Sequence, residues 1–175
     1  MQNWYIIHVV SRKERSVIAQ INRYFDKDIL TAFIPQREWL FRKQGKAKLE
    51  TQLLFPGYIF IESCLDNNEF IAIVYPTIMQ LDGVIRVLSY GRDGNYTVHQ
   101  KEQKQLLFLL DENYCVRISS CFIEGDKVYI NKGPLAGKES IIRKINRHKY
   151  EARIDFEIFG AVRVIVVGLE VLQKI

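Results

Sequence analysis

The stretch that decides the fold of the C-terminal part of this chain is Gly125-Asp-Lys-Val-Tyr-Ile-Asn-Lys-Gly-Pro-Leu-Ala-Gly-Lys-Glu-Ser-Ile-Ile142. Short apolar runs alternate in it with Gly-Asp and Gly-Pro breaks, a pattern typical of short strands joined by tight turns. The same pattern continues toward the C-terminus and predicts strands over 127–131, 138–144, 151–158 and 162–167. Short strands closed by turns over a segment of this length predict a small β-barrel. Because such a barrel has little core, we expect its fold to depend on turn glycines: Gly125, Gly133, Gly137, Gly160 and Gly168.

Residues 1–112 show a different pattern, in which strand and helix signals alternate. Trp4–Val10 is a β-branched and aromatic run typical of a buried strand. Apolar residues at helical spacing then predict a helix over 12–26, with Ser11 and Glu14 as a capping box at its start. Further signals predict strands over 30–34, 53–61 and 84–88, a short helix that Asp66 or Asn67 caps and Pro76 ends, and a helix opened by Thr97 and Gln100. The order β-α-β-β-α-β-α predicts an α+β sandwich, with helices packed on an antiparallel or mixed sheet.

The two patterns meet in a stretch without a clear period. Residues 111–123 mix polar and apolar side chains and contain neither proline nor glycine. We therefore expect an N-terminal domain over 1–112, a linker over 113–123 and a C-terminal barrel domain over 124–175.

A basic hairpin is expected within the N-terminal domain. Between Arg37 and Glu50 the apolar residues Trp39 and Phe41 give way to cations around Gly45, and the chain turns apolar again at Leu53. This pattern predicts a long β-hairpin with a basic tip. The tip is either a solvated loop or a nucleic-acid contact made by Arg42, Lys43, Lys46 and Lys48.

A second basic run lies in the C-terminal domain. Five cations and one acid occupy the eleven residues from Arg143 to Arg153, with His148 and Tyr150 interleaved. A strand end and loop of this kind project several cations toward a phosphate backbone, and side chains such as Arg147 can also stack on unpaired RNA bases. The alternative is a solvated hairpin; we favour an RNA site made by Arg143, Lys144, Arg147, His148, Lys149 and Arg153.

Composition excludes several classes of function. The formal net charge of +5 leans toward polyanionic partners. There is no nucleophile elbow, P-loop or metal-ligand spacing, so we expect no enzyme activity, no catalytic residue, no metal and no cofactor. Three scattered cysteines suit a reducing compartment, the N-terminus lacks the features of a signal peptide, and no apolar run approaches the ~18 residues that span a bilayer. We expect a cytoplasmic monomer that does not contact membranes.

The residues resemble a known family along the whole chain. Gly125–Ile142 resembles the KOW motif, and the Trp4-Tyr5 strand with Phe55-Pro-Gly-Tyr58-Ile-Phe-Ile resembles the NGN domain of the NusG family. The segments Lys144–Lys149, Phe159-Gly160 and Leu169–Ile175 are most similar to LoaP, a specialised subgroup of that family. One departure is Ser140, which stands where KOW motifs usually carry glycine and puts the local turn and its usual contacts in doubt.

The resemblance implies an α/β NGN domain followed by an SH3-like barrel, and a role in transcription elongation. It implies that an apolar pocket, matched here by Trp4, Phe55 and Tyr58, binds the clamp helices of bacterial RNA polymerase; the alternative is that all three side chains are core. It further implies a processive antiterminator recruited by a nascent RNA hairpin, in contact with upstream or non-template DNA. The alternatives are a housekeeping NusG that couples polymerase to Rho or the ribosome, and a ribosome-associated KOW protein.

Overall fold

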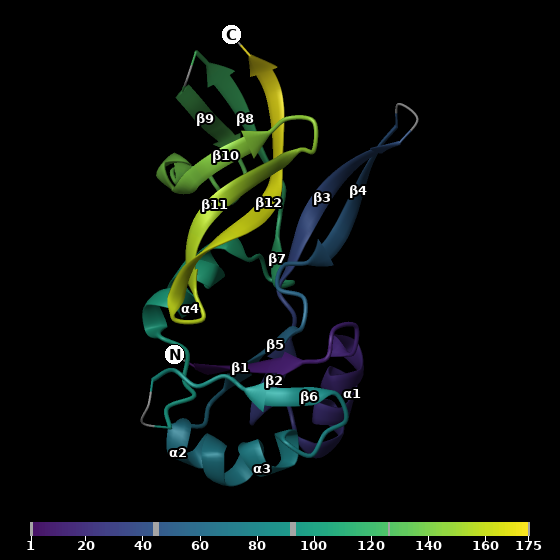
Figure 1. Cartoon of the computed structure of the whole chain (residues 1–175), viewed down its shortest axis with the longest axis vertical. Helices are drawn as coiled ribbons and strands as arrows, with labels where there is room; N and C mark the ends of the chain where they lie inside the picture. The colour runs from purple at the N-terminus through teal and green to yellow at the C-terminus, as the bar shows by residue number, and fades with distance from the viewer. Residues whose placement is uncertain (1, 44–45, 92–93, 126, 175) are drawn as a thin grey trace. The chain divides into compact units, whose positions relative to one another are not determined.

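The computed structural model describes residues 2–43, 46–91, 94–125 and 127–174. The chain forms two compact units (Figure 1). Unit 1 comprises Met1–Ile34 and Phe55–Gln103, and unit 2 comprises Pro35–Leu54 and Lys104–Ile175. This division differs from the boundaries expected from the sequence, because residues 35–54 group with the C-terminal part of the chain.

Unit 1 is built on a four-stranded antiparallel sheet with the strand order β2-β5-β1-β6. Its strands are β1 (Asn3–Val9), β2 (Leu30–Phe33), β5 (Tyr58–Ser63) and β6 (Val84–Val87). The central strand β1 is buried over Trp4–Ile7, as the apolar run predicts. Strand β5 begins later than expected, since residues 54–57 form the turn that leads into it.

The first helix, α1 (Glu14–Tyr24), begins without the expected capping box. Its N-cap is Lys13, which makes no side-chain capping bond, so the prediction for Ser11 and Glu14 is wrong. Glu14 is instead buried, and its carboxylate accepts a hydrogen bond from the Gly57 amide at 2.7 Å. The tertiary contact replaces the local one and holds the Pro-Gly turn against the end of β1, where the Val9 amide also donates to the Gly57 carbonyl.

The second helical segment of unit 1 consists of α2 (Asn67–Glu69), the π-helical turn η1 (Phe70–Val74) and α3 (Tyr75–Ile78). Asp66 caps it, one of the two residues expected to do so, and Glu69 completes a capping box that the sequence analysis did not predict. Pro76 does not end it: the π-helical turn η1 precedes proline, which lies in the first turn of α3. The last helix, α4 (Gln100–Leu109), follows after β6.

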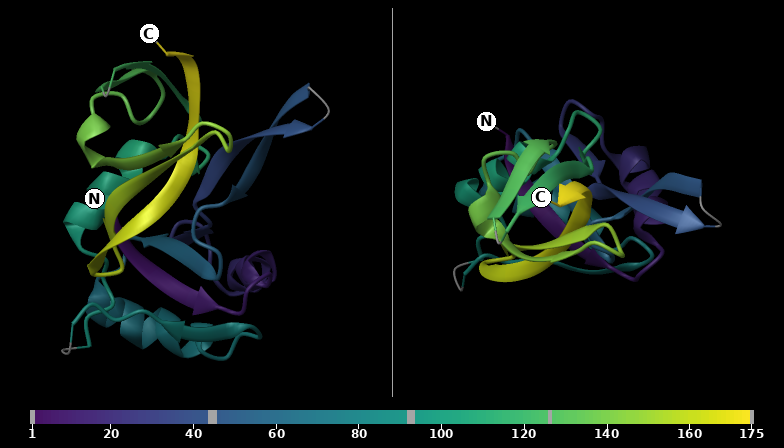
Figure 2. Two further views of the ribbon diagram at one scale, coloured as in Figure 1. Left: turned by 45° about the horizontal axis from the view of Figure 1, so that its top comes forward. Right: turned by 90° about the horizontal axis from the view of Figure 1, so that it is seen from above.

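Unit 2 contains a five-stranded sheet with the order β10-β11-β12-β8-β9 (Figures 1 and 2). Its strands are β8 (Ser119–Glu124), β9 (Lys127–Lys132), β10 (Ile142–Asn146), β11 (Glu151–Ile158) and β12 (Ala161–Lys174). The long strand β12 pairs antiparallel with β11 up to Gly168 and then parallel with β8 from Leu169 onward. Buried side chains between the strands include Cys121, Leu135, Ile154, Val167 and Leu169.

Three local expectations for this sheet need correction. The expected linker over 113–123 is mostly strand, since β7 (Cys115–Val116) and β8 lie in it. The expected strand over 138–144 is divided between the 3-10 turn η2 (Glu139–Ile141) and β10. Ser140 lies in η2 and is not among the residues of positive φ, so serine is unstrained there.

The basic hairpin forms as predicted, from β3 (Gln36–Lys43) and β4 (Lys46–Leu53); Gly45 and the side chain of Lys43 lie outside the described residues. Its base is part of unit 2, because β3 pairs in parallel with β7 and Arg37 donates a hydrogen bond to the Val166 carbonyl of β12. Gly168 of β12 permits this approach. A Cβ atom there would lie 2.6 Å from the Glu38 carbonyl oxygen, so close contact rather than a turn explains this glycine.

Candidate nucleic-acid interface

The basic run lies on the hairpin of β10 and β11 and on the turn that joins them. Lys144 and Arg153 are exposed and lie directly opposite each other across the two strands. Arg147, His148 and Lys149 form the exposed part of the turn. The positive charge of Arg143 is instead compensated by Asp155, since Arg143 Nε lies 3.3 Å from Asp155 Oδ1. The structure therefore gathers the predicted cations on one hairpin, with Arg143 the member held in an ion pair.

The turn itself has a defined backbone. The Lys149 amide donates to Asn146 Oδ1 at 3.1 Å, and the Leu169 amide of β12 donates to the Tyr150 carbonyl at 2.9 Å. Tyr150 has a φ of +53°, a left-handed conformation that bulky side chains seldom adopt. The cations are thus presented on a fixed loop.

The second predicted basic element lies beside this turn within unit 2. The guanidinium carbon of Arg42 lies 5.1 Å from the centroid of the Tyr150 ring, in a cation–π contact. A cavity of about 330 Å³ opens between the two elements; we call it the hairpin–turn groove. Its lining residues are Trp39, Leu40, Phe41 and Arg42 from β3, and His148, Lys149 and Tyr150 from the turn.

The other cations of the hairpin lie on β4. Lys46 and Lys48 are exposed, and Lys48 Nζ pairs with Glu50 Oε1 at 2.9 Å. Exposed ion pairs of this kind contribute little to stability, so Lys48 remains available to a phosphate. A second hollow, of about 360 Å³, borders Lys144 and Arg147 on the barrel, where Ile123 and Val128 also line it.

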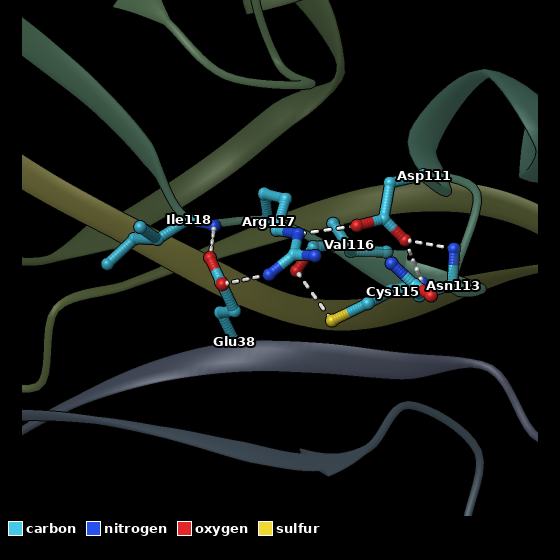
Figure 3. A network of polar contacts seen from close by, with 7 residues as sticks. All are labelled: Glu38, Asp111, Asn113, Cys115, Val116, Arg117 and Ile118. Atoms are coloured by element: carbon cyan, nitrogen blue, oxygen red, sulfur yellow. Dashed lines mark hydrogen bonds and ion pairs between the residues drawn. The ribbon is translucent and has the colours of Figure 1, made fainter.

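An ion-pair network fixes the base of β3 against β7 and β8 (Figure 3). Glu38 is buried; it accepts from Arg117 Nη1 at 2.7 Å and from the Ile118 amide at 2.9 Å. Arg117 also donates through Nε to Asp111, whose other oxygen accepts from the amides of Asn113 and Cys115. Burial alone would raise the pKa of Asp111, but the bonds from the Cys115 amide and from Arg117 lower it overall. The sequence analysis missed this anchor: Glu38 stands between Arg37 and Trp39 in the basic hairpin, and no local pattern marks it as buried.

The predicted polymerase-binding aromatics lie in unit 1 and differ in exposure. Trp4 is 1% exposed and Phe55 is 7% exposed. Both belong to a buried aromatic cluster with Phe33 and Phe60, in which ring centroids lie 5.2–6.1 Å apart. Tyr58 is half-buried and stacks on His8 with the ring centroids 4.9 Å apart.

His8 lies between Tyr58 and the cationic side chain of Arg86. It lies opposite Tyr58 on one side and opposite Arg86 on the other, so the three side chains form a row across β5, β1 and β6. Nδ1 of His8 is buried and has no hydrogen-bond partner among the described atoms. Of the three predicted aromatics, Tyr58 is thus the one that reaches the surface of unit 1.

The three free thiols differ in exposure, and Cys64 is the exposed one. Cys115 and Cys121 are buried, and burial raises the pKa of both thiols, which keeps them protonated at neutral pH. No group of three or more histidine, cysteine, aspartate or glutamate side chains lies close enough to hold a metal ion in the described parts of the chain. None of the described helices is long and apolar enough to cross a membrane.

Comparison with known proteins places these features in one class, the transcription termination and antitermination factors. A family model described as "Transcription termination factor nusG" matches residues 2–107. This chain belongs to the NusG family.

Relatives and a solved structure extend over nearly the whole chain. The chain is 28% identical to the transcription termination/antitermination protein NusG of Treponema pallidum, over 98% of this chain and 97% of the relative. It is 23% identical to the NusG of Borreliella burgdorferi, over 98% of each. A solved structure described as "Domain interaction in Thermotoga maritima NusG" has a TM-score of 0.53 at 23% identity and covers 96% of this chain and 94% of that one. The fold is therefore that of an NGN-like α+β part followed by a KOW-like β-barrel.

Proposed function

We propose that this chain is a targeted antiterminator of the NusG family, which binds RNA polymerase through unit 1 and a nascent RNA hairpin through unit 2. The observation that carries the proposal is the exposed cationic surface of the β10–β11 hairpin, to which β3 adds Arg42. A family role in termination and antitermination supplies both a polymerase and a transcript.

The pairing of cations across the two strands supports a polyanionic ligand. Lys144 and Arg153 lie directly opposite each other, and like charges in such pairs destabilise a sheet. Nothing in the folding of the barrel requires this arrangement. A phosphate bound between the two side chains would turn their repulsion into attraction, and this favours nucleic acid over a merely solvated hairpin.

Polymerase binding through unit 1 rests on the row formed by Tyr58, His8 and Arg86. An accessible aromatic pair with an adjacent cation suits the tip of an amphipathic helix better than the buried rings of Trp4 and Phe55 do. In this proposal Tyr58 makes the contact, whereas Trp4 and Phe55 support the sheet from which it projects.

Two substitutions test the proposed RNA binding by unit 2: one removes a positive charge, and the other keeps the charge but changes the shape of the side chain. Gel-shift titrations would compare wild type, Lys144→Ala and Arg147→Lys on a candidate hairpin and on a loop mutant of it. Lys144→Ala should weaken both complexes equally and reduce the salt dependence by about one phosphate contact. Arg147→Lys keeps the charge but removes the planar fork, so it should reduce the preference for the intact loop.

The candidate RNA would come from transcripts that co-purify with the protein. Enrichment of one leader transcript supports a targeted factor. Polymerase binding without any selective RNA would favour a general NusG factor, which acts with Rho or the ribosome.

A further inference from the structure

We propose that the hairpin–turn groove binds an unpaired base of a single-stranded nucleic acid, with Tyr150 and Phe41 as its stacking surfaces. The inference deepens the proposed function, on which it rests for the presence of a transcript. It adds a site for a base to the phosphate-binding surface of the β10–β11 hairpin.

The composition of the groove fits a base with its phosphate. Three of its lining residues are aromatic: Trp39, Phe41 and Tyr150. Phe41 is 49% exposed although it lies on a strand, which leaves much of its ring open to a ligand. Arg42, His148 and Lys149 surround these rings, and none of the groove's described lining residues is acidic. Aromatic faces beside cations are what proteins use to bind single strands.

The backbone of Tyr150 gives a second, independent indication. Its φ of +53° is strained for a residue with a side chain, and a glycine would adopt the same turn without strain. The hydrogen bond from Leu169 is made to the Tyr150 carbonyl, so the barrel needs the backbone of this residue rather than its ring. The ring makes its contact with Arg42, across the groove. The Tyr150 ring therefore lines the groove, where it contacts Arg42.

The Arg42 contact shows how a base would be held. The Arg42 guanidinium lies over the Tyr150 ring, and an unpaired base could stack on that ring in its place or beside it. The bases of a duplex are already stacked on their neighbours and offer no open face. The groove should therefore distinguish single-stranded from double-stranded nucleic acid, which the cations on the outer side of the hairpin cannot do.

The test uses the full chain and three defined probes: a single-stranded RNA of ten nucleotides with a central 2-aminopurine, the DNA of the same sequence, and the RNA as a blunt duplex. Wild type should quench the 2-aminopurine fluorescence of a single strand on binding. Tyr150→Gly should weaken single-strand binding roughly 5- to 100-fold, the range expected when one stacking ring is removed. It should leave duplex binding unchanged and should not lower Tm, since it relieves the strain.

Phe41→Ala gives a second variant on the opposite wall, and it should weaken the same probe. Tyr129→Ala is the matched control, because Tyr129 is 47% exposed on β9 of the same unit and does not line the groove. Its affinity should stay within about twofold of wild type. A preference for the RNA strand or for the DNA strand identifies the source of the base, and either supports the site.

Three results would overturn the proposal: no quenching by wild type, equal losses for Tyr150→Gly on single strand and duplex, or a loss for Tyr129→Ala as large as that for Tyr150→Gly. These results are independent of the proposed function. A chain that binds single strands through the groove but enriches no transcript refutes targeted antitermination only. A chain that enriches a transcript equally well with Tyr150→Gly refutes the groove only.

Discussion

At the scale of single residues, exposure separates the aromatics that the family resemblance groups together. Trp4 is 1% exposed within a cluster of rings, whereas Tyr58 is half-buried and stacks on His8. Trp4 can therefore contribute to polymerase binding only through the stability of the sheet. Tyr58 can contact the polymerase directly.

We expect Tyr58→Ala to weaken binding to core RNA polymerase by roughly 30-fold, the loss of one aromatic hot spot, without lowering Tm much. Trp4→Ala should instead destabilise unit 1 by about 3–5 kcal/mol, as large buried truncations do. Tyr24→Ala serves as the control, because Tyr24 is 65% exposed on α1 of the same unit. Surface-immobilised polymerase and thermal unfolding measure the two effects. Normal polymerase binding by a well-folded Tyr58→Ala variant would contradict the assignment.

Residues also show where local sequence rules fail. Ser11 and Glu14 have the spacing of a capping box, yet Glu14 binds the Gly57 amide, 43 residues away. Asp66 and Glu69 have the same spacing and do form a capping box. The difference lies in burial: Glu14 has a buried amide to satisfy, whereas Asp66 and Glu69 lie near the surface. No local pattern contains that information.

At the scale of elements, the Glu38–Arg117–Asp111 network is what attaches β3 to β7 and β8. The pKa of Asp111 is lowered in the folded chain relative to its ordinary value of 3.8. As the pH falls, the unfolded state therefore takes up this proton first, and folding loses stability. The contribution is fully present above the ordinary pKa and is lost as the pH falls through the lower, folded value.

Urea unfolding of unit 2 should thus show a loss of stability below about pH 4 that is smaller in Asp111→Asn than in wild type. At neutral pH the wild type should be the more stable of the two chains, because Asp111→Asn lacks the charged bond to Arg117. Glu112→Gln, a change in the neighbouring exposed carboxylate, should keep the wild-type profile. Parallel pH profiles for wild type and Asp111→Asn would show that this carboxylate does not anchor β3.

The elements of unit 2 also show which parts of a sheet can be predicted from sequence. Strand β11 and the β3–β4 hairpin follow from alternation and turn residues, and both form where expected. The parallel pairing of β3 with β7 does not, because it joins Gln36 to Cys115 and depends on Glu38, Arg117 and the missing side chain of Gly168. The hairpin–turn groove depends on that pairing, so its two walls were predicted separately and their proximity was not.

At the scale of the whole molecule, the start of β8 determines which fragment can fold. A fragment that begins at residue 122, just before the expected barrel domain of residues 124–175, lacks Ser119, Ser120 and Cys121 of β8. Ser119 and Cys121 are buried, and these three residues pair with Leu169, Glu170 and Val171 of β12.

We therefore expect residues 118–175 to give a well-dispersed proton–nitrogen NMR spectrum and residues 122–175 to give a collapsed one. The shorter fragment loses three of the five β8–β12 pairs, among them the pair of the buried Leu169 with Ser119. A dispersed spectrum from both fragments would mean that β9 to β12 suffice for the barrel. A collapsed spectrum from both would mean that the fold requires the rest of unit 2, which comprises the β3–β4 hairpin and residues 104–117.

The placement of residues 35–54 in unit 2 has a consequence for biosynthesis. The β3–β4 hairpin leaves the ribosome before the rest of unit 2, yet the strand that receives the Arg37 hydrogen bond is near the C-terminus, at Val166. At translation rates of about 5–20 residues per second, the hairpin waits on the order of 5–20 seconds for that strand. During this interval the base of the hairpin, where Glu38 is buried in the folded chain, has no barrel to pack against. The nascent chain therefore carries the β3–β4 hairpin without its partner strand through most of its synthesis. The cations of the hairpin help to keep it soluble until β12 has been synthesised.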